Sequence, residues 1–337
     1  MGRILLGRLA TAIPTLFGVI VVTFLLTHAL PGDPAAYFAG PSASQESIED
    51  VRHQLGLDRS WPVQFVQYVK ALAHGDLGMS LNTGQPVRSE ILTRLPASAE
   101  LTLFGLMLAV LVALPLGIVA ALRPGSFADH ACRILTTAGV SLPPFFTGLL
   151  LVYIFYYVLG WAPAPLGRLD VFYSPPPQIT GFNLIDTLLT GDLATFRASF
   201  VQLLLPGITL AVFAMAPLAR ITRASMLSAL SSDFVRTARA SGLSFWQIVA
   251  VHALRNAMLP VVTILGMVFS FLLGANVLVE KVFAWPGIGS YAIDALIASD
   301  YAPVQGFVLT MAVLYVMLNL VIDVAYGALD PRVGFAA

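Results

Sequence analysis

The sequence is poor in charge. Of its 337 residues only 11% are charged and 58% are hydrophobic, whereas soluble domains carry about 25% charged residues. A soluble core could not bury so much apolar surface, so the composition predicts an integral membrane protein. The formal net charge is zero, and we therefore expect no nucleic-acid partner.

Motifs for catalysis or nucleotide binding are also missing. The single cysteine, Cys132, cannot form an internal disulfide or a metal cluster, and we interpret it as a packing residue. The only lysines, Lys70 and Lys281, do not stand in a G-x-x-x-x-G-K-[ST] loop. No H-E-x-x-H or G-x-S-x-G motif occurs. We predict that this chain is not an enzyme and holds no cofactor or metal.

Long apolar runs, in contrast, are abundant. The first could be mistaken for a signal peptide, but its 22 apolar residues exceed the roughly 7–15 of a signal peptide's hydrophobic region, so we expect an uncleaved span. Crossing a bilayer takes about 20 apolar residues. Six segments qualify: Leu9–Leu30, Leu101–Leu122, Ile134–Leu159, Phe200–Leu218, Leu259–Val279 and Pro303–Val324. The predicted fold class is therefore all-α with six transmembrane helices.

Arginine distribution sets the predicted orientation. One side, comprising 1–8, 123–133, 219–258 and 325–337, carries ten arginines and three acidic residues. The other side, comprising 31–100, 160–199 and 280–302, is longer and carries eight basic and 14 acidic residues. The positive-inside rule then places both termini in the cytoplasm.

Ionisable groups are scarce within the spans. His28, Glu280 and Asp323 lie near span ends. Ion-coupled carriers place such groups at mid-depth to bind the driving ion. Transport against a gradient would therefore need energy from another subunit.

The outer segments allow more than one interpretation. The stretch 31–98 contains amphipathic sequence such as SWPVQFVQYVKALAHGDLG, which is typical of an interfacial helix resting on the membrane or of a folded cap that contacts an external partner. The segment 160–199, with its SPPPQ run, is expected to be an ordered loop that covers the pore.

The cytoplasmic segment DFVRTARASGLSFWQIVAVHALRNAMLP, residues 233–260, is polar yet helix-forming. We predict a helix over 225–240, a left-handed glycine turn at Gly242, and a capping box that starts a second helix over 245–258. That helix aligns Ile248, Val249, His252, Ala253 and Asn256 on one side. The pattern indicates either a docking element for a partner or an anchor for anionic lipid head groups.

This segment resembles the cytoplasmic loop of ABC-importer permeases, whose signature is E-A-A, a glycine, and then I-x-L-P. With Gly242 on the glycine, Arg236, Thr237 and Ala238 align with E-A-A, and His252, Leu254 and Arg255 with I, L and P. Only Ala238, Gly242 and Leu254 match. Since Arg236 replaces the glutamate, Asp233 is the acid available for an ion pair.

A closer resemblance is to the B-type permease subunits of the dipeptide, oligopeptide and nickel importers. It is carried by VRTARASGL (235–243) and HALRNAMLPVVT (252–263), and by LPGDPA (30–35), LGLD (55–58), GDLGMS (75–80), RLPASAELTL (94–103), FAWPGIGSYAIDAL (283–296) and DPR (330–332). These blocks follow in order along nearly the whole chain.

The resemblance implies a type I ABC-importer permease in the prokaryotic inner membrane. It divides the chain into a first span (1–30), an extracytoplasmic segment (31–94), a five-helix core with coupling helices at 225–258 (95–327), and a cytoplasmic tail (328–337). Implied partners are a C-type permease, two ATPase subunits that bind ATP and Mg²⁺, an extracytoplasmic binding protein, and membrane lipid. Implied coupling residues are Asp233, Arg236, Thr237, Ala238, Arg239, Ala240, Gly242, Leu254 and Arg255.

The transported solute is less constrained. Dipeptides or short oligopeptides fit the resemblance best, while nickel, glutathione and sugar-derived importers share the same blocks. A different class of function, an ATP-independent channel or carrier, is disfavoured by the lack of ionisable groups within the spans.

Overall fold

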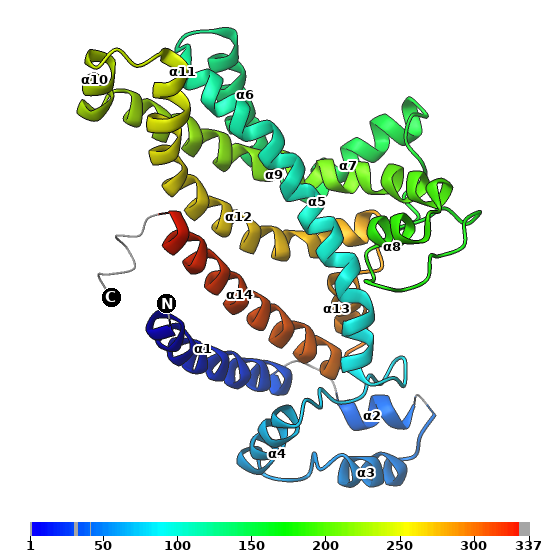
Figure 1. Cartoon of the computed structure of the whole chain (residues 1–337). Helices are drawn as coiled ribbons and strands as arrows, with labels where there is room; N and C mark the ends of the chain where they lie inside the picture. The colour runs from blue at the N-terminus through cyan, green and yellow to red at the C-terminus, as the bar shows by residue number, and fades with distance from the viewer. Residues whose placement is uncertain (1, 30–32, 41, 330–337) are drawn as a thin grey trace. The chain divides into compact units, whose positions relative to one another are not determined.

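The computed structural model describes residues 2–29, 33–40 and 42–329, and these are almost entirely helical, as the composition predicts (Figure 1). The helices are α1 (Gly2–Ala29), α2 (Pro34–Ala39), α3 (Gln45–Gln54), α4 (Trp61–Ala73), α5 (Val87–Leu122), α6 (Phe127–Ser141), α7 (Pro144–Leu151), the π-helical segment η1 (Val152–Val158), α8 (Asn183–Thr190), α9 (Leu193–Leu230), α10 (Asp233–Ala240), α11 (Phe245–Gln247), the π-helical segment η2 (Ile248–Ala253), α12 (Leu254–Val282), α13 (Ile288–Ile297) and α14 (Tyr301–Leu329).

Within these residues, four helices are long and apolar enough to cross a membrane: Val87–Leu122, Leu193–Leu230, Phe245–Val282 and Tyr301–Ile322. They contain three of the six predicted spans and overlap a fourth, Pro303–Val324, over residues 303–322. Thr11–Leu25, within α1, and Pro144–Val158 are shorter apolar helices. The count of six spans therefore remains a prediction. The predicted tail at 328–337 and the LPGDPA and DPR motifs lie partly or wholly outside the described residues.

The predicted span Ile134–Leu159 is wrong as a single helix. It is interrupted between α6 and α7, where Leu142 is extended with φ −113° and ψ 135°. The cause is the Pro143-Pro144 pair, because a proline disfavours the helical region for the residue before it. Pro144 then occupies the first turn of α7, where its missing N–H is not needed.

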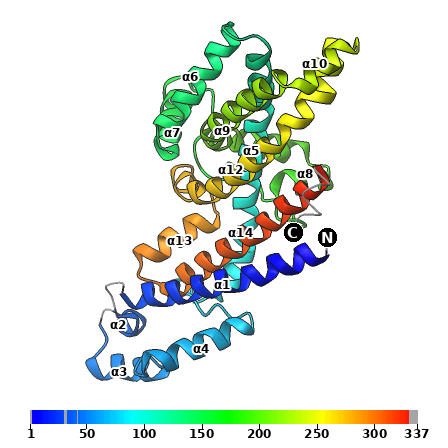
Figure 2. The same ribbon diagram turned by 90° about the vertical axis from the view of Figure 1, so that its left-hand side faces the viewer.

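The chain forms two compact units. The first consists of the described residues up to Pro96 together with Pro286–Met317. In it, α4 lies beside α1 (Figure 2): the ring of Phe24 packs edge-on against Phe65 at 5.2 Å, and the His28 ring bonds the Gln64 side chain at 3.0 Å. The predicted helix in the outer segment thus exists, and packing against α1 buries part of its aromatic surface.

The second unit consists of Ala97–Trp285 with the described residues from Leu318 onward. Its centre is α9, which packs against α12, α6, α7 and α8. Close approach to α5 depends on Gly117, where an added Cβ would lie 2.7 Å from the Cβ of Thr222. Small residues of this kind let membrane helices pack backbone to backbone.

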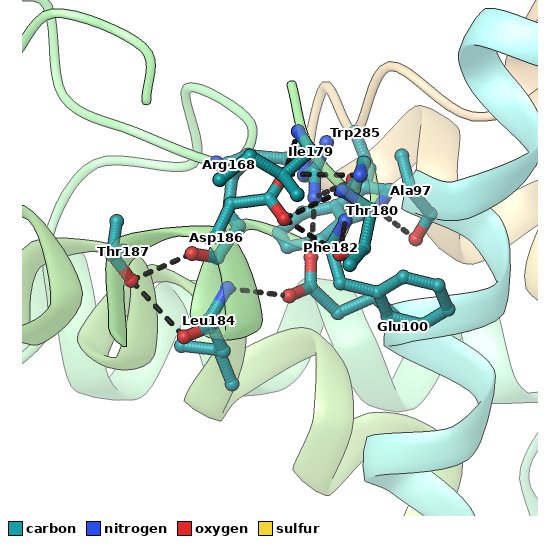
Figure 3. Close-up of polar contacts among 12 residues, drawn as sticks. Ala97, Glu100, Arg168, Ile179, Thr180, Phe182, Leu184, Asp186, Thr187 and Trp285 are labelled. Atoms are coloured by element: carbon teal, nitrogen blue, oxygen red, sulfur yellow. Dashed lines mark hydrogen bonds and ion pairs between the residues drawn. The ribbon is translucent and has the colours of Figure 1, made fainter. Parts of the chain in front are cut away.

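The outer segment 160–199 is ordered by buried acidic side chains (Figure 3). The carboxylate of Glu100 pairs with Arg168 at 2.6 Å and accepts the backbone N–H of Leu184 at 2.8 Å. Arg168 also donates to the carbonyl oxygen of Gly181. Asp186 accepts hydrogen bonds from the backbone N–H and hydroxyl of Thr180. These bonds fix the loop within its own unit, so its predicted order is confirmed; its role over a pore stays a prediction.

Candidate functional site

The candidate site is the short connection between α9 and α11. The predicted single helix over 225–240 is wrong, because α9 ends at Leu230 and α10 begins at Asp233. Between them, Ser232 is extended at φ −75° and ψ 157° and its hydroxyl donates to the Ala229 carbonyl oxygen. Serine bonds its neighbouring backbone readily, which ends one helix and starts another. We call residues 231–247 the knob.

The predicted glycine turn at Gly242 is confirmed. Gly242 has φ +79°. Its N–H donates to the Arg239 carbonyl oxygen at 3.0 Å, and the N–H of Leu243 donates to the Ala238 carbonyl oxygen at 3.3 Å. This pair of bonds is a Schellman motif, which requires a left-handed residue at this position. An added Cβ would meet nothing within 4 Å, so the turn needs glycine for its backbone conformation alone.

The predicted capping box is also confirmed. The Ser244 hydroxyl oxygen accepts the N–H of Gln247, and the Gln247 side chain accepts the N–H of Ser244. The helix that starts here does not end at 258 as predicted. It continues through Pro260 to Val282, because helices in membrane bundles tolerate proline.

Apolar contacts join the knob to the long helices. Val235 and Ala238 of α10 pack on Ile248. Next to them, Met226 and Ala229 at the end of α9 pack with buried residues of the helix that follows, Val249, Ala253 and Ala257. Figure 1 shows α10 as a short helix at the end of α9, beside the start of the helix through α11 and α12. α10 is therefore joined by apolar packing to the helix that continues into α12, and the end of α9 packs on that same helix.

The predicted coupling residues divide into two groups. Ala238 is buried and Leu254 is half-buried against the apolar cluster, so both serve packing. The others are exposed: Asp233, Arg236, Thr237, Arg239, Ala240, Gly242 and Arg255. Asp233 and Arg236 contact each other at 2.8 Å although their side chains are 92% and 78% exposed. Both charges therefore remain accessible.

Four exposed apolar side chains of the knob were missed by the sequence reasoning: Phe234, Leu243, Phe245 and Trp246. Trp246 is 70% exposed, and its ring packs edge-on against Phe245 at 5.4 Å. The signal was available, since two aromatic residues in the first turn of a polar helix have no core to face. Exposed aromatics rimmed by charge are typical of interaction surfaces.

A buried acid that the sequence reasoning also missed anchors the base of the site. Asp129 of α6 pairs with Arg223 of α9 at 2.6 Å and with Arg133 at 3.0 Å, and it accepts the N–H of Gly125. Hydrogen bonds from Arg223 and then Gly125 hold the pKa of this carboxyl well below its usual range. The pair ties α6 to α9 about two turns before the knob begins.

Nothing in this arrangement suggests bond-breaking chemistry. The knob offers a rigid turn, exposed aromatic rings and accessible charges of both signs on a support that continues into long apolar helices. Such a surface can bind another protein and transmit displacement. His252 is half-buried on this support, and the Asn256 side chain donates to its carbonyl oxygen.

Comparison with known families gives two matches that together cover most of the chain. The model described as "Binding-protein-dependent transport system inner membrane component" matches residues 113–335. The model of an N-terminal membrane component of binding-protein-dependent transport systems matches residues 1–102.

The matches to similar curated proteins extend over nearly the full length of both chains. A probable D,D-dipeptide transport system permease protein of Escherichia coli (strain K12) is 45% identical over 94% of this chain and 93% of its own. A di/tripeptide transport system permease protein of Pseudomonas aeruginosa is 44% identical over 97% of each. A glutathione transport system permease protein of Escherichia coli O6:H1 is 39% identical, also over 97% of each.

Among solved structures, the MetNI methionine ABC transporter in an inward-facing conformation has a chain that matches with a TM-score of 0.50 and 16% identity. The match covers 70% of this chain and 93% of that one. At this identity the likeness concerns the fold alone.

Proposed function

This chain belongs to the family of inner-membrane components of binding-protein-dependent transport systems, and from that premise we propose that it is the B-type permease subunit of an ATP-driven importer of dipeptides or short oligopeptides. The observation that carries the proposal is identity of 44–45% to two peptide transport permeases over nearly the whole chain. The chain forms half of the translocation pathway, and a similar C-type permease forms the other half.

Energy enters through the knob. Two ATPase subunits bind ATP and Mg²⁺, and one of them holds α10 and the adjoining aromatic residues in a cleft. The contacts of Val235 and Ala238 with Ile248 support this role, because they make the knob move as one body with its helices. Closure of the ATPases then swings α9 and α12 between inward-open and outward-open states, as in rigid-body alternating access.

The residues proposed to contact the ATPase are Asp233, Arg236, Thr237, Arg239, Ala240, Gly242 and Arg255, together with Phe245 and Trp246. Because Arg236 stands where many permeases carry glutamate, Asp233 supplies the acid of the pair. Ala238 and Leu254 support these residues from the buried side. Binding of anionic lipid by the three arginines is the competing interpretation and is an outcome of the tests below.

We propose six crossings of the inner membrane with both termini in the cytoplasm. The four long helices supply four crossings, α1 a fifth, and α6, α7 and η1 together the broken sixth. The arginine-rich segments 123–133 and 219–258 support the orientation. On the opposite side, the segment 31–94 and the loop 160–199 face the binding protein that delivers the solute.

A second solute, glutathione, is supported by the 39% identical glutathione permease. Glutathione is itself a short peptide, so both solutes suit one pathway. Solute choice therefore rests with the binding protein in this proposal.

The test is co-expression with a C-type permease and two ATPases of a peptide importer from the same organism, followed by affinity purification and uptake of labelled dipeptide or glutathione. We expect the four subunits to co-purify, and deletion of 233–242 to abolish ATPase retention while membrane insertion persists. Shortening the outer loop by Ser174–Gln178 is the control and should leave ATPase retention intact. Solute uptake by the purified chain alone in vesicles would refute the proposal.

A further inference from the structure

A cavity of about 200 Å³ lies in the first unit, between the loop that precedes α5, the first turns of α5, and α13 with the turn after it. It is lined by Ser80, Asn82, Thr83, Arg94, Tyr291, Asp294, Ala295 and Asp300. In the proposed topology the residues that line the cavity lie on the outer side of the membrane. The coupling mechanism makes no use of the cavity.

The wall of the cavity contains a buried carboxylate that is only half satisfied. Asp300 is fully buried. One of its oxygens, Oδ2, accepts the Ser80 hydroxyl at 2.7 Å and the N–H of Asn82 at 3.1 Å. The other, Oδ1, has no hydrogen-bond partner, and neither has the buried hydroxyl of Tyr291. Buried polar atoms nearly always have partners, so two orphans at one cavity indicate a missing ligand.

Charge around the cavity favours a cation. Asp294 and Asp300 contribute two carboxylates, and Arg94 is the one basic residue in the lining. The Arg94 guanidinium lies 4.9 Å from the centre of the Tyr291 ring and 3.4 Å from the carboxylate of Glu90. Its charge is thereby offset by Glu90, which leaves the negative charge of Asp300, whose Oδ1 has no partner, at the cavity.

The hydroxyl of Tyr291 is neutral at physiological pH. Burial, reinforced by the negative charge of Glu90, raises the pKa of Tyr291 to about 12. A neutral phenol oxygen can accept a hydrogen bond alongside the carboxylate.

We propose that this cavity binds a primary ammonium group, with Asp300 Oδ1 and the Tyr291 hydroxyl oxygen accepting two of its three N–H bonds. An ammonium group presents three donors and no acceptor, which matches two unpartnered acceptors beside a surplus of negative charge. The volume is smaller than the roughly 300–1,000 Å³ of drug-sized pockets. It fits the end of a chain rather than a whole large molecule.

Two sources could supply the ammonium group: the free amino terminus of a small peptide, or a lysine side chain of the binding protein. The choice of these two sources rests on the proposed import function. The ammonium chemistry itself depends only on the cavity, so it is tested without ATP and without partner subunits.

The first experiment uses the full-length chain in lipid nanodiscs and n-butylammonium as the probe, with binding measured by saturation-transfer NMR. Butylammonium should bind saturably, and tetramethylammonium, which lacks N–H groups, at least about tenfold more weakly. Asp300→Asn should weaken butylammonium binding about tenfold, because an oxygen remains for Ser80 and Asn82 while the charge is lost. Asp58→Asn, a partly exposed aspartate elsewhere in the first unit, is the matched control and should bind as the parent does.

Tyr291→Phe provides a second variant that removes only an oxygen, and about threefold weaker binding is expected. If Asp300→Asn fails to fold, the binding of butylammonium by Tyr291→Phe tests the proposal instead. Absence of saturable binding, or equal binding by the parent and both variants, means that the cavity holds water alone and overturns the proposal.

The second experiment separates the sources. A dipeptide that competes with butylammonium and loses this ability on N-acetylation identifies the solute. Competition by the binding protein that disappears when its lysines are acetylated identifies the partner. If neither the dipeptide nor the binding protein competes, both proposed sources are wrong. If ATP-dependent uptake fails while the amine still binds, only the proposed import function is contradicted.

Discussion

The segment 160–199, predicted to lie outside, and the knob both connect helices of the second unit, and both contain aspartate and arginine. At the segment 160–199, charged side chains form hydrogen bonds and an ion pair with other groups of this chain. Asp186 and Glu100 are buried, and their oxygens accept bonds from Thr180, Leu184 and Arg168. In the knob, Asp233 and Arg236 stand in solvent and contact only each other among the described side chains.

This difference separates a loop that completes its own fold from one that awaits a partner. A buried ion pair fixes a conformation, and removing one member leaves an uncompensated charge. An exposed pair contributes little to stability and can be exchanged for contacts with another protein. The same residue types therefore predict opposite mutational behaviour at the two ends of this unit.

The largest expected effect comes from removing a buried cation. Arg168→Met should destabilise the purified protein by about 3 kcal/mol, because Glu100 would keep its charge in a buried site. The matched change on the knob, Arg236→Met, should cost less than about 1 kcal/mol. Thermal unfolding in detergent measures both, and similar losses for the two variants would remove the distinction between the loops.

The next effect concerns exposed tryptophans. Trp246→Ala should weaken association with the ATPase by about 2 kcal/mol, as expected of a central aromatic contact in an interface. Trp161→Ala, in the outer segment and 74% exposed, is the matched control and should leave association unchanged. Binding of purified ATPase to the permease in nanodiscs is the measurement. Loss of liposome binding by Trp246→Ala with ATPase affinity intact favours the lipid anchor.

Two glycines with the same geometry sharpen the comparison further. Gly242 and Gly191 have φ of +79° and +71°, and an added Cβ at either would meet nothing within 4 Å. Valine at each position should cost about 1–2 kcal/mol of backbone strain. Only Gly242→Val should lower ATP-driven uptake, by several-fold, with insertion intact.

Gly242→Asn should retain uptake, since asparagine tolerates this conformation. Equal uptake by Gly242→Val and the parent would show that the shape of this turn is not used in coupling.

The smallest effect concerns acid. Burial alone would raise the pKa of Asp186, but hydrogen bonds from Thr180 and its neighbours outweigh it and lower the pKa. A lowered pKa in the folded state gives stabilisation that is present above the unfolded pKa, near 4, and is lost as the pH falls through the folded value. Thr180→Val should reduce this stabilisation by about 1 kcal/mol above pH 5.

The matched change is Thr237→Val. The Thr237 hydroxyl donates only to the backbone oxygen of Asp233, so its removal should leave the loss of stability at low pH as it is in the parent. Thermal unfolding between about pH 3 and pH 6 measures both variants. An unchanged acid limb in Thr180→Val would mean that Asp186 relies on its backbone donors alone.

Features set by local chemistry were predictable from the sequence. The turn at Gly242 and the capping box at Ser244 follow from residues within a few positions of each other. Helix continuity was harder, because the same residue acts differently in different settings. Pro143 ends a helix together with Pro144, whereas Pro260 lies inside a continuous one.

The residues predicted for the site lie in or near the knob, but the prediction did not include its exposed aromatic side chains. Alignment with a family signature directed attention to charged positions, so Phe245 and Trp246 were not considered. The pairing of Asp129 with Arg223 could not be predicted either. Arg223 lies 94 positions away along the chain, and only the packing of α6 on α9 brings the two together.

The helix that begins beside the knob at Phe245 runs without interruption for 38 residues to Val282, about 57 Å at 1.5 Å per residue. A tilt of about 10° at its base would sweep its far end through about 10 Å. That end carries Asn276 and Glu280, which bond Ser98 on α5. In the proposed topology, a helix of this length would convert a small displacement at the knob into a larger one at its far end, and the bonds to Ser98 on α5 would be among the first contacts that such a movement strains.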